Sequence, residues 1–402
     1  MTRTPFALAA LASAAVPGLD PVGVQTVLGG DDRFDTAIVA DTDDRTWVIR
    51  APRSEALAGQ MDLASTYLAL LARRVPFAVP LVRGWVDLKE GGRAAVSHLL
   101  PGERVDFAAL PPGPGVTAEL GRTIGTLHNV DPALAEEAGL STYPADDYRR
   151  RRLAALDRAA ATGHVPAALL TRWESALEDT ALWHYHPVPV HGSLRSDNVL
   201  VTFTDPDDAA TGTVKALTGW EDARVGDPAD DFAALVAHAS TEAVHAALEA
   251  YAHTRVERPD RNLLVRATLA AEMSRLSGLV AASAAGDEVR VQRIAAALAQ
   301  LADDLADAEP LTQIQPRTRR RPVDVAAQAG DANAEVDGEH GAVETEFATT
   351  DDLADTDGTD GTGPVPAAGE MPADDVAADE VAAGEVSVDD DVTAPHPPVA
   401  PN

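Results

Sequence analysis

The 402-residue sequence predicts an α+β protein with two lobes, a small mixed β lobe followed by a mostly helical lobe, and an acidic tail after them. Three observations predict this arrangement. Short runs rich in β-branched and aromatic residues, separated by turn-forming residues, fill most of the first hundred positions. Apolar residues at helical spacing follow. The composition then changes to small and acidic residues. The expected parts are residues 1–20, 21–101, 102–309 and 310–402.

The N-terminal segment, residues 1–20, contains an apolar run that admits two interpretations. A basic residue, an Ala/Leu-rich stretch and an Ala-Ser-Ala sequence imitate a secretory signal peptide. The run is, however, only about ten residues long, which is too short to span a membrane. It also leads through Pro17, Gly18 and Pro21 directly into the first predicted strand. We therefore favour a short amphipathic helix that belongs to the domain, and a cytoplasmic protein.

The β lobe, residues 21–101, is expected to hold three strands, one helix and two further strands. Turn-forming sequences separate the first three strands, one at Gly29-Gly30-Asp31-Asp32 and one at residues 41–45. Apolar residues recur at helical spacing from Leu57 to Leu71, which predicts the helix. A Lys-Glu-Gly-Gly turn joins the last two strands. The expected strands are residues 22–28, 34–40, 46–51, 79–88 and 93–99.

The helical lobe, residues 102–309, shows a longer apolar period. Leu120, Ile124 and Leu127 indicate one helix that ends near His128, and a similar pattern from Val291 onward indicates the last helix. Short apolar runs between these helices flank polar loops and are expected to be strands. They cover residues 187–191, 199–201 and 214–217.

Charge and composition exclude several classes of function. The formal net charge is −32, and residues 311–402 alone carry 21 acidic and 4 basic side chains. The remainder of the chain is acidic as well, which argues against nucleic acid or an anionic membrane as a partner. There are no cysteines, so disulfides and thiolate chemistry are excluded, while the redox compartment stays undecided.

The tail, residues 310–402, contains very little apolar or aromatic surface. Such a segment cannot bury enough of it to offset the entropy of ordering, so we expect the tail to be disordered. Four arginines between Arg317 and Arg321 form a small basic cluster. This cluster is either a contact site for an anionic partner or a solubilising linker. The tail is the part of the chain that we expect to contact a protein partner, if there is one.

Two polar segments of the helical lobe carry the clearest motifs. The first is His-Gly-Ser-Leu-Arg-Ser-Asp-Asn at residues 191–198, and the second runs Thr-Gly-Trp-Glu-Asp-Ala-Arg-Val-Gly-Asp-Pro-Ala-Asp-Asp at residues 218–231. Together they resemble the signature of the aminoglycoside and macrolide phosphotransferases, bacterial relatives of protein kinases. The pattern of that family is His-Gly-Asp-Leu-x-x-x-Asn, then Ile-Asp-Trp or Phe, then Gly-Asp-Pro-x-x-Asp. The matching residues are His191, Gly192, Leu194, Asn198, Trp220, Gly226, Asp227, Pro228 and Asp231.

The resemblance covers about residues 20–305 and implies a protein-kinase-like fold, with ATP and Mg²⁺ as cofactors and a small molecule as the second ligand. It implies that Arg50 meets the nucleotide phosphates, together with backbone donors near Gly29 and Gly30. His191 would shape the catalytic loop, and Asn198 would be a catalytic-loop residue and a metal ligand. Each has a structural alternative, since an arginine also pairs with nearby carboxylates.

The departures from the family pattern fall on the residues that the chemistry needs. The proton-accepting aspartate of the family is Ser193 here, and a hydroxyl is no base near neutral pH, which typically removes a factor of about 10²–10⁴ in rate. The metal-holding aspartate is Gly219, which offers no side-chain oxygen to a cation that prefers a hard oxygen shell. The helix glutamate expected to pair with the strand cation falls near Ala64.

Three hypotheses follow for the function. The first is a small-molecule kinase fold with impaired or lost phosphoryl transfer, acting as a binding or regulatory module. The second is an active ATP-dependent phosphotransferase of a hydroxylated amine, antibiotic or metabolite, with relocated carboxylates at Asp197, Glu221 or Asp222. The third is a structural adaptor whose acidic tail is the working part.

Asp227 and Asp231 are interpreted as loop and helix-cap residues.

Overall fold

The computed structural model describes residues 2–27, 33–205 and 208–313. All of them belong to one compact unit, Met1–Val323. The expectations for Gly29 and Gly30, and those for the tail beyond residue 313 with its arginine cluster, lie outside the described residues.

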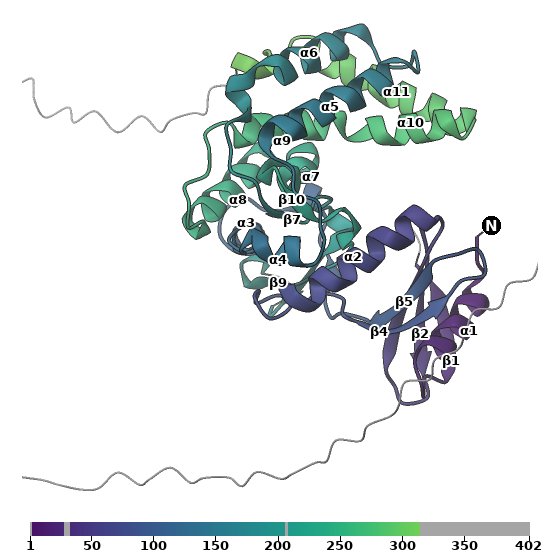
Figure 1. The fold of residues 1–402 in the computed structure, drawn as a ribbon. Helices are drawn as coiled ribbons and strands as arrows, with labels where there is room; N and C mark the ends of the chain where they lie inside the picture. The colour runs from purple at the N-terminus through teal and green to yellow at the C-terminus, as the bar shows by residue number, and fades with distance from the viewer. Residues whose placement is uncertain (1, 28–32, 206–207, 314–402) are drawn as a thin grey trace, which may run out of the picture. The chain divides into compact units, whose positions relative to one another are not determined.

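The β lobe is a five-stranded antiparallel sheet with the order β1-β2-β3-β5-β4 (Figure 1). Its register aligns Thr36 with Arg50, and Arg50 with Ala95, so that Arg50 lies in the middle of the sheet. The mixed lobe that the sequence predicts is confirmed. Its strands are β1 (Pro21–Thr26), β2 (Phe34–Asp41), β3 (Thr46–Pro52), β4 (Val82–Asp87) and β5 (Arg93–His98).

Two helices cover the two faces of this sheet. Helix α1 (Pro5–Ala15) begins after Thr4, whose side chain accepts a hydrogen bond from the Ala7 amide. Its buried residues pack with Val39, Ile49 and Val96 on one face. This is the N-terminal helix that the sequence predicts. Because side chains alternate along a strand, the other face presents Val48 and Arg50 towards helix α2 (Glu55–Leu71) and the cavity described below.

Helix α2 contributes to two separate groups of buried residues. Tyr67 and Leu71 belong to the large core of the helical lobe. Met61, nearer the start of the helix, packs with Phe34 and Ala95 of the sheet in a much smaller cluster. The helix therefore joins the sheet to the rest of the molecule, with most of its apolar side chains on the helical-lobe side.

The fourth expected strand, residues 79–88, begins only at Val82. The preceding segment pairs instead with strand β9 (Gly212–Leu217): the Ala78 amide donates to Lys215 O at 2.7 Å, and the Leu217 amide donates to Ala78 O at 3.1 Å. Pro80 has no amide hydrogen to give to a sheet ladder, which separates these two pairings. The segment thus links the two lobes by backbone hydrogen bonds.

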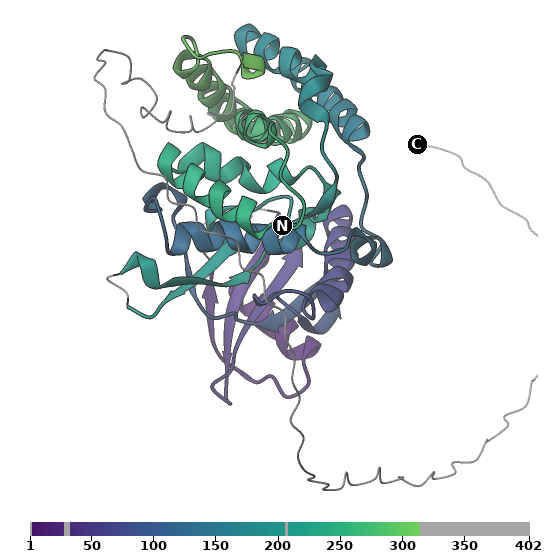
Figure 2. The same cartoon turned by 90° about the vertical axis from the view of Figure 1, so that its left-hand side faces the viewer.

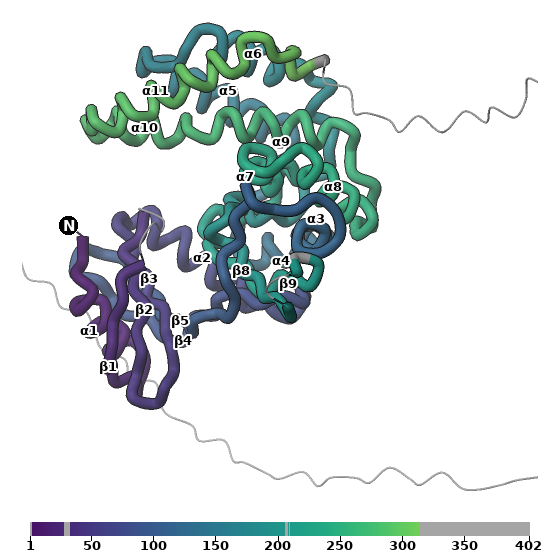
Figure 3. Tube along the Cα trace, turned by 180° about the vertical axis from the view of Figure 1, so that it is seen from behind, coloured from purple at the N-terminus to yellow at the C-terminus, as the bar shows by residue number. Residues whose placement is uncertain are grey.

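The helical lobe contains two groups of helices (Figures 1 and 3). One group packs around the core that also holds the short strands, and α3 makes its most extensive contact with α8. The other group has its own core, which includes Trp173 and Leu298. The first group comprises α3 (Val116–His128), α4 (Pro132–Glu137), α7 (Ala233–His238), α8 (Thr241–Thr254) and α9 (Leu263–Glu272), and the second comprises α5 (Ala145–Ala160), α6 (Ala167–Glu178), α10 (Leu276–Ala284) and α11 (Glu288–Asp304).

Short strands of this lobe frame the polar loops. Strand β7 (Val188–Val190) pairs with β10 (Arg224–Gly226), and β8 (Val199–Phe203) forms a hairpin with β9 (Figure 2). Strand β6 (Glu103–Arg104) extends the hairpin on its other edge. The strands expected near residues 187–191, 199–201 and 214–217 are therefore present. No described helix has the length and apolar character required to cross a membrane.

The last described residues extend the packed part of the lobe past residue 309, where the sequence places the start of the tail. Leu311 is 1% exposed and lies in the core of the α5–α6–α10–α11 group. The Arg172 guanidinium donates to the Glu309 carbonyl at 2.6 Å, which holds the segment in place. The short turn Leu311–Gln313 is therefore part of the helical lobe.

This packing yields a prediction for Leu311. The Leu311→Ala variant should lose about 2–3 kcal/mol of unfolding free energy, because truncation leaves a cavity in the core. Val256→Ala serves as the control, since Val256 is 86% exposed, and it should change stability by less than about 0.5 kcal/mol. Urea denaturation monitored by circular dichroism measures both. Equal midpoints for the two variants would contradict the packing of Leu311.

Candidate functional site

The two sequence motifs meet because the strands that carry them pair with each other. Residues 191–198 follow β7, and residues 218–223 connect β9 to β10, the partner of β7. The Thr218 amide donates to the carbonyl of Asn198 at 2.9 Å, which joins the two loops directly. Two loops that are twenty or more positions apart in the sequence thus form one site.

Asp231 fixes the position of the first loop. Its carboxylate accepts hydrogen bonds from the backbone amides of His191 at 2.9 Å and Gly192 at 2.7 Å. Nε2 of His128, on α3, lies 3.0 Å from the same carboxylate. Burial alone would raise the pKa of Asp231, but the hydrogen bonds and the nearby imidazoles lower it, so the group stays ionised. Asp231 therefore anchors the loop from within the helical lobe.

His191 faces the protein interior. Its Nε2 lies 2.7 Å from the Thr218 carbonyl, and burial lowers its pKa, so the neutral ring donates this hydrogen bond. The ring also packs on Trp220, with 4.5 Å between ring centroids, and Tyr67 of α2 meets Trp220 edge-on at 6.2 Å. His191 thus joins the two loops to α2, and it does not line the cavity.

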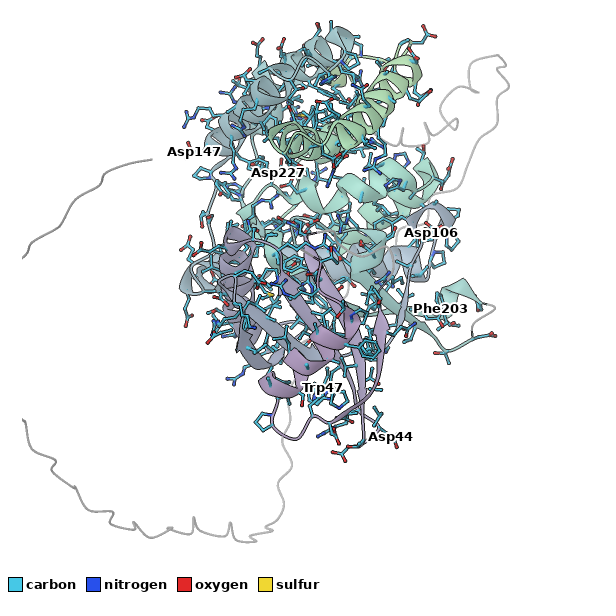
Figure 4. The ribbon with its side chains drawn as sticks, turned by 90° about the vertical axis from the view of Figure 1, so that its right-hand side faces the viewer. Asp44, Trp47, Asp106, Asp147, Phe203 and Asp227 are labelled. Atoms are coloured by element: carbon cyan, nitrogen blue, oxygen red, sulfur yellow. The ribbon has the colours of Figure 1, made fainter. Side chains whose placement is uncertain are left out.

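The other aspartates of the second motif pair with arginines. Asp227 caps the turn that begins at Pro228 and lies between helix groups (Figure 4), where it accepts two hydrogen bonds from the buried Arg266 at 2.8 and 3.1 Å. Asp230 accepts hydrogen bonds from Arg152 and, at 2.6 Å, from Arg224. The interpretation of Asp227 as a cap residue agrees with its contacts.

Ser193, Asn198 and Gly219 form the centre of the candidate site. Nδ2 of Asn198 donates to the Ser193 carbonyl at 2.8 Å, so the asparagine holds the loop closed. Gly219 has a left-handed backbone, with φ +76° and ψ 49°. A Cβ atom at this position would lie 2.6 Å from Oδ1 of Asn198. The asparagine amide thus occupies the space that a side chain at residue 219 would need.

A cavity of about 570 Å³ lies between the sheet and these loops. Apolar residues such as Val48, Leu68 and Leu200 line part of it, and Gly219 lies in its wall. The charged residues in its wall carry more positive than negative charge, although the chain as a whole is strongly acidic. These residues are Arg33, Arg50, Arg104, Arg195, Asp197 and Glu221.

The carboxylates in and beside this wall are paired with its arginines. Glu221 accepts hydrogen bonds from both terminal nitrogens of Arg50, and the guanidinium also lies over the Phe34 ring at 4.1 Å. Asp222, which follows Glu221, accepts hydrogen bonds from Arg33 at 2.9 and 3.2 Å. Asp197 pairs with Arg195 at 3.2 Å.

The residues present do not fit a magnesium ion. No cluster of three or more acidic or histidine side chains suited to a metal occurs among the described residues. Gly219 supplies no side-chain oxygen, and Asn198, whose Nδ2 bonds to the loop, offers only its single Oδ1. A cation with a strict octahedral oxygen shell would therefore find a poor set of ligands here.

The structure brings together some of the residues that the sequence singles out. Ser193, Asn198 and His191 share one loop, and Arg50 lies across the cavity from that loop. Ala64 lines the cavity and offers no carboxylate, so Arg50 pairs with Glu221 instead. Sequence analysis did not identify Arg33, Arg104 and Arg195 as cavity residues, because no motif marks them.

Comparison with known proteins gives two sequence matches. A model of the phosphotransferase enzyme family matches residues 24–264, which is more than half of the chain. The uncharacterized protein YcbJ of Bacillus subtilis (strain 168) is 24% identical over 206 residues. That match covers 50% of this chain and spans 65% of the relative's length.

Solved structures show the same fold. Macrolide 2'-phosphotransferase MphH from Brachybacterium faecium is 29% identical, with a TM-score of 0.60 over 73% of this chain and 97% of that one. A type I macrolide 2'-phosphotransferase is 24% identical, with a TM-score of 0.61 over 74% and 98%. The GDP and kanamycin complex of APH(2")-IIIa is 18% identical, with a TM-score of 0.62 over 75% and 98%. The expected two-lobed, protein-kinase-like fold is confirmed.

The geometry at residue 219 gives a prediction with a matched control. Gly163 has nearly the same backbone angle, φ +74°, but nothing within 4 Å of its Cβ position. Both Gly219→Asp and Gly163→Asp should lose about 1–2 kcal/mol through left-handed strain. Gly219→Asp should lose about 1 kcal/mol more, because it displaces the hydrogen-bonded Asn198 amide. Urea denaturation compares the unfolding free energies of the two variants. Equal losses would show that the Asn198 side chain moves aside at no cost.

Proposed function

Because the chain belongs to the phosphotransferase enzyme family, we propose that it is a member with impaired or lost phosphoryl transfer that acts as a binding or regulatory module. Its ligands would be a nucleotide and a small molecule, held by the cavity between the sheet and the loops. The observation that carries this proposal is that Ser193 and Gly219 stand where the family pattern has its two catalytic aspartates, and that the Asn198 amide lies where the Cβ atom of residue 219 would be.

Phosphoryl transfer requires a small number of groups in one transition state. A carboxylate accepts the proton of the attacking hydroxyl, metal ions bridge the phosphates, and a cation neutralises the developing charge. Arg50 is the counterpart of the cation and Asn198 of one metal ligand, while Ser193 stands at the base position and Gly219 at the position of the metal-holding aspartate. Loss of general-base catalysis alone removes about 10²–10⁴ in rate, and loss of the metal adds to it.

The cavity supports the binding part of the proposal. Its volume of about 570 Å³ lies within the range of roughly 300–1,000 Å³ typical of small-molecule sites. It combines apolar walls with several guanidinium groups, which suits a ligand with a flat ring system and phosphates. Structural neighbours include a complex with GDP and kanamycin, so a nucleotide is the ligand class that we carry over to this chain.

The rival proposal, an active enzyme with relocated carboxylates, has less support. Each of its three candidate groups is already engaged: Asp197 with Arg195, Glu221 with Arg50 and Asp222 with Arg33. A guanidinium partner competes with a metal or a proton for the same carboxylate, so each pair weakens the candidate as a ligand or a base. The cytoplasmic location, the absence of nucleic-acid and membrane partners, and a protein partner for the tail stay predictions from composition.

Nucleotide titration tests the proposal directly. Isothermal titration calorimetry should detect weak ATP binding. Added Mg²⁺ should change the dissociation constant by less than about threefold, because the site offers the ion a poor set of ligands. Arg50→Gln should weaken the binding, whereas Arg122→Gln, at an exposed site on α3, should leave it unchanged. Strong binding that requires Mg²⁺ would favour the active-enzyme hypothesis.

Restoring the two missing carboxylates tests the catalytic part. Ser193→Asp supplies a base and Gly219→Asp a metal ligand, so ATP turnover of the double variant should exceed the sum of the single effects. The strain at residue 219 calls for a thermal melt of each variant beside the assay. Wild-type turnover at an ordinary kinase rate of about 1–100 per second would refute impaired transfer.

A further inference from the structure

A single short turn presents two carboxylates to the β lobe. The turn η5 (Trp220–Asp222) follows Gly219 and carries Glu221 and Asp222 in succession. Each of them meets an arginine of the opposite lobe, Arg50 in β3 and Arg33 just before β2. The two ion pairs therefore connect the turn to the sheet across the edge of the cavity.

Both contacts use the geometry by which a guanidinium recognises a planar anion. Two nitrogens of Arg50 meet the two oxygens of Glu221, and two nitrogens of Arg33 meet the two oxygens of Asp222. Arginine binds phosphate oxygens through the same fork of donors. A phosphate that binds the two terminal nitrogens of Arg50 or of Arg33 must therefore replace the carboxylate that is bound to them.

The turn itself does not depend on these two side chains. Trp220 is buried, and its indole nitrogen donates to the Leu217 carbonyl at 2.8 Å. The Asp222 carbonyl accepts a hydrogen bond from Arg224 at 2.6 Å, and Arg224 is held in turn by Asp230. The backbone of the turn is thus fixed from the helical lobe by contacts that involve neither carboxylate side chain.

We propose that Glu221 and Asp222 are internal competitors for a phosphate-bearing ligand, whose phosphates exchange with these carboxylates at Arg50 and Arg33 and need no divalent cation. The inference rests on the proposed function of the cavity as a nucleotide site. Exchange releases the turn from the sheet, so ligand binding loosens the connection between the two lobes. A ligand with more phosphates competes better, because it offers more charge and more acceptor oxygens.

The test is a titration of the full chain with ATP, ADP, AMP and inorganic tripolyphosphate in the presence of a chelator. Glu221→Gln keeps the shape of the side chain and removes its charge, so it should tighten ATP and tripolyphosphate binding roughly three- to tenfold. The affinity for AMP should increase less in this variant. Glu119→Gln removes the same charge from an exposed pair with Arg122 on α3, and it should change nothing.

A double-mutant cycle separates exchange from a general change in charge. In an Arg50→Gln background, Glu221→Gln should give no gain, because the arginine that it would free is absent. A gain that persists in this background would overturn the exchange. Asp222→Asn provides a second route, since Asp222 is part-exposed and its loss should be tolerated even if Glu221→Gln melts early.

The outcomes separate this inference from the proposed function. Wild-type ATP binding that neither Glu221→Gln nor Asp222→Asn strengthens overturns the exchange and leaves the nucleotide site standing. Binding that appears or tightens only in these variants supports the exchange. Failure of the wild type and of every variant to bind any of the four probes refutes the nucleotide site, and the exchange with it.

Discussion

The arrangement of the site depends on one buried carboxylate. The Asp231 carboxylate accepts hydrogen bonds from the backbone amides of His191 and Gly192, and these bonds fix the position of the loop that follows β7. From this loop Asn198 reaches both Ser193 and the position of Gly219. The turn after Gly219 in turn carries the carboxylates that hold Arg33 and Arg50. A single charge inside the helical lobe thus sets the geometry of a cavity wall by successive short contacts.

The residues that match the family pattern include some with a structural role, which differ from the positions that depart from it. Asp227 and Asp231 have buried partners that the fold requires, Arg266 in one case and two backbone amides in the other. Their removal would leave buried groups unpaired, which is costly whether or not the protein is a catalyst. Ser193 and Gly219 stand where the family pattern has aspartates, and neither position carries such a buried ion pair or amide contact. A phosphotransferase fold can therefore persist on the first kind of residue while the second kind changes.

Local patterns in the sequence predict most of the fold. Alternation and turn residues identify the strands around Arg50, and helical spacing identifies α2 and α11, because these signals act within a few residues. The pairing of Arg50 with Glu221 joins positions 171 residues apart, and no local pattern encodes it. The strand expected at residues 79–88 begins only at Val82, and Ala78 just before it bonds to β9, because tertiary contacts outweigh the propensity of an apolar run.

Helix α2 has a mechanical consequence for the molecule. Its residues Tyr67 and Leu71 are packed into the large core of the helical lobe, whereas Met61 meets the sheet in a small cluster. A displacement of α2 from the helical lobe would expose far more apolar surface than a displacement of the sheet from α2. The weaker of the two apolar contacts of α2 is therefore its contact with the sheet. Separation of the sheet from α2 would break the smaller of these two apolar contacts, and α2 would remain packed with the helices.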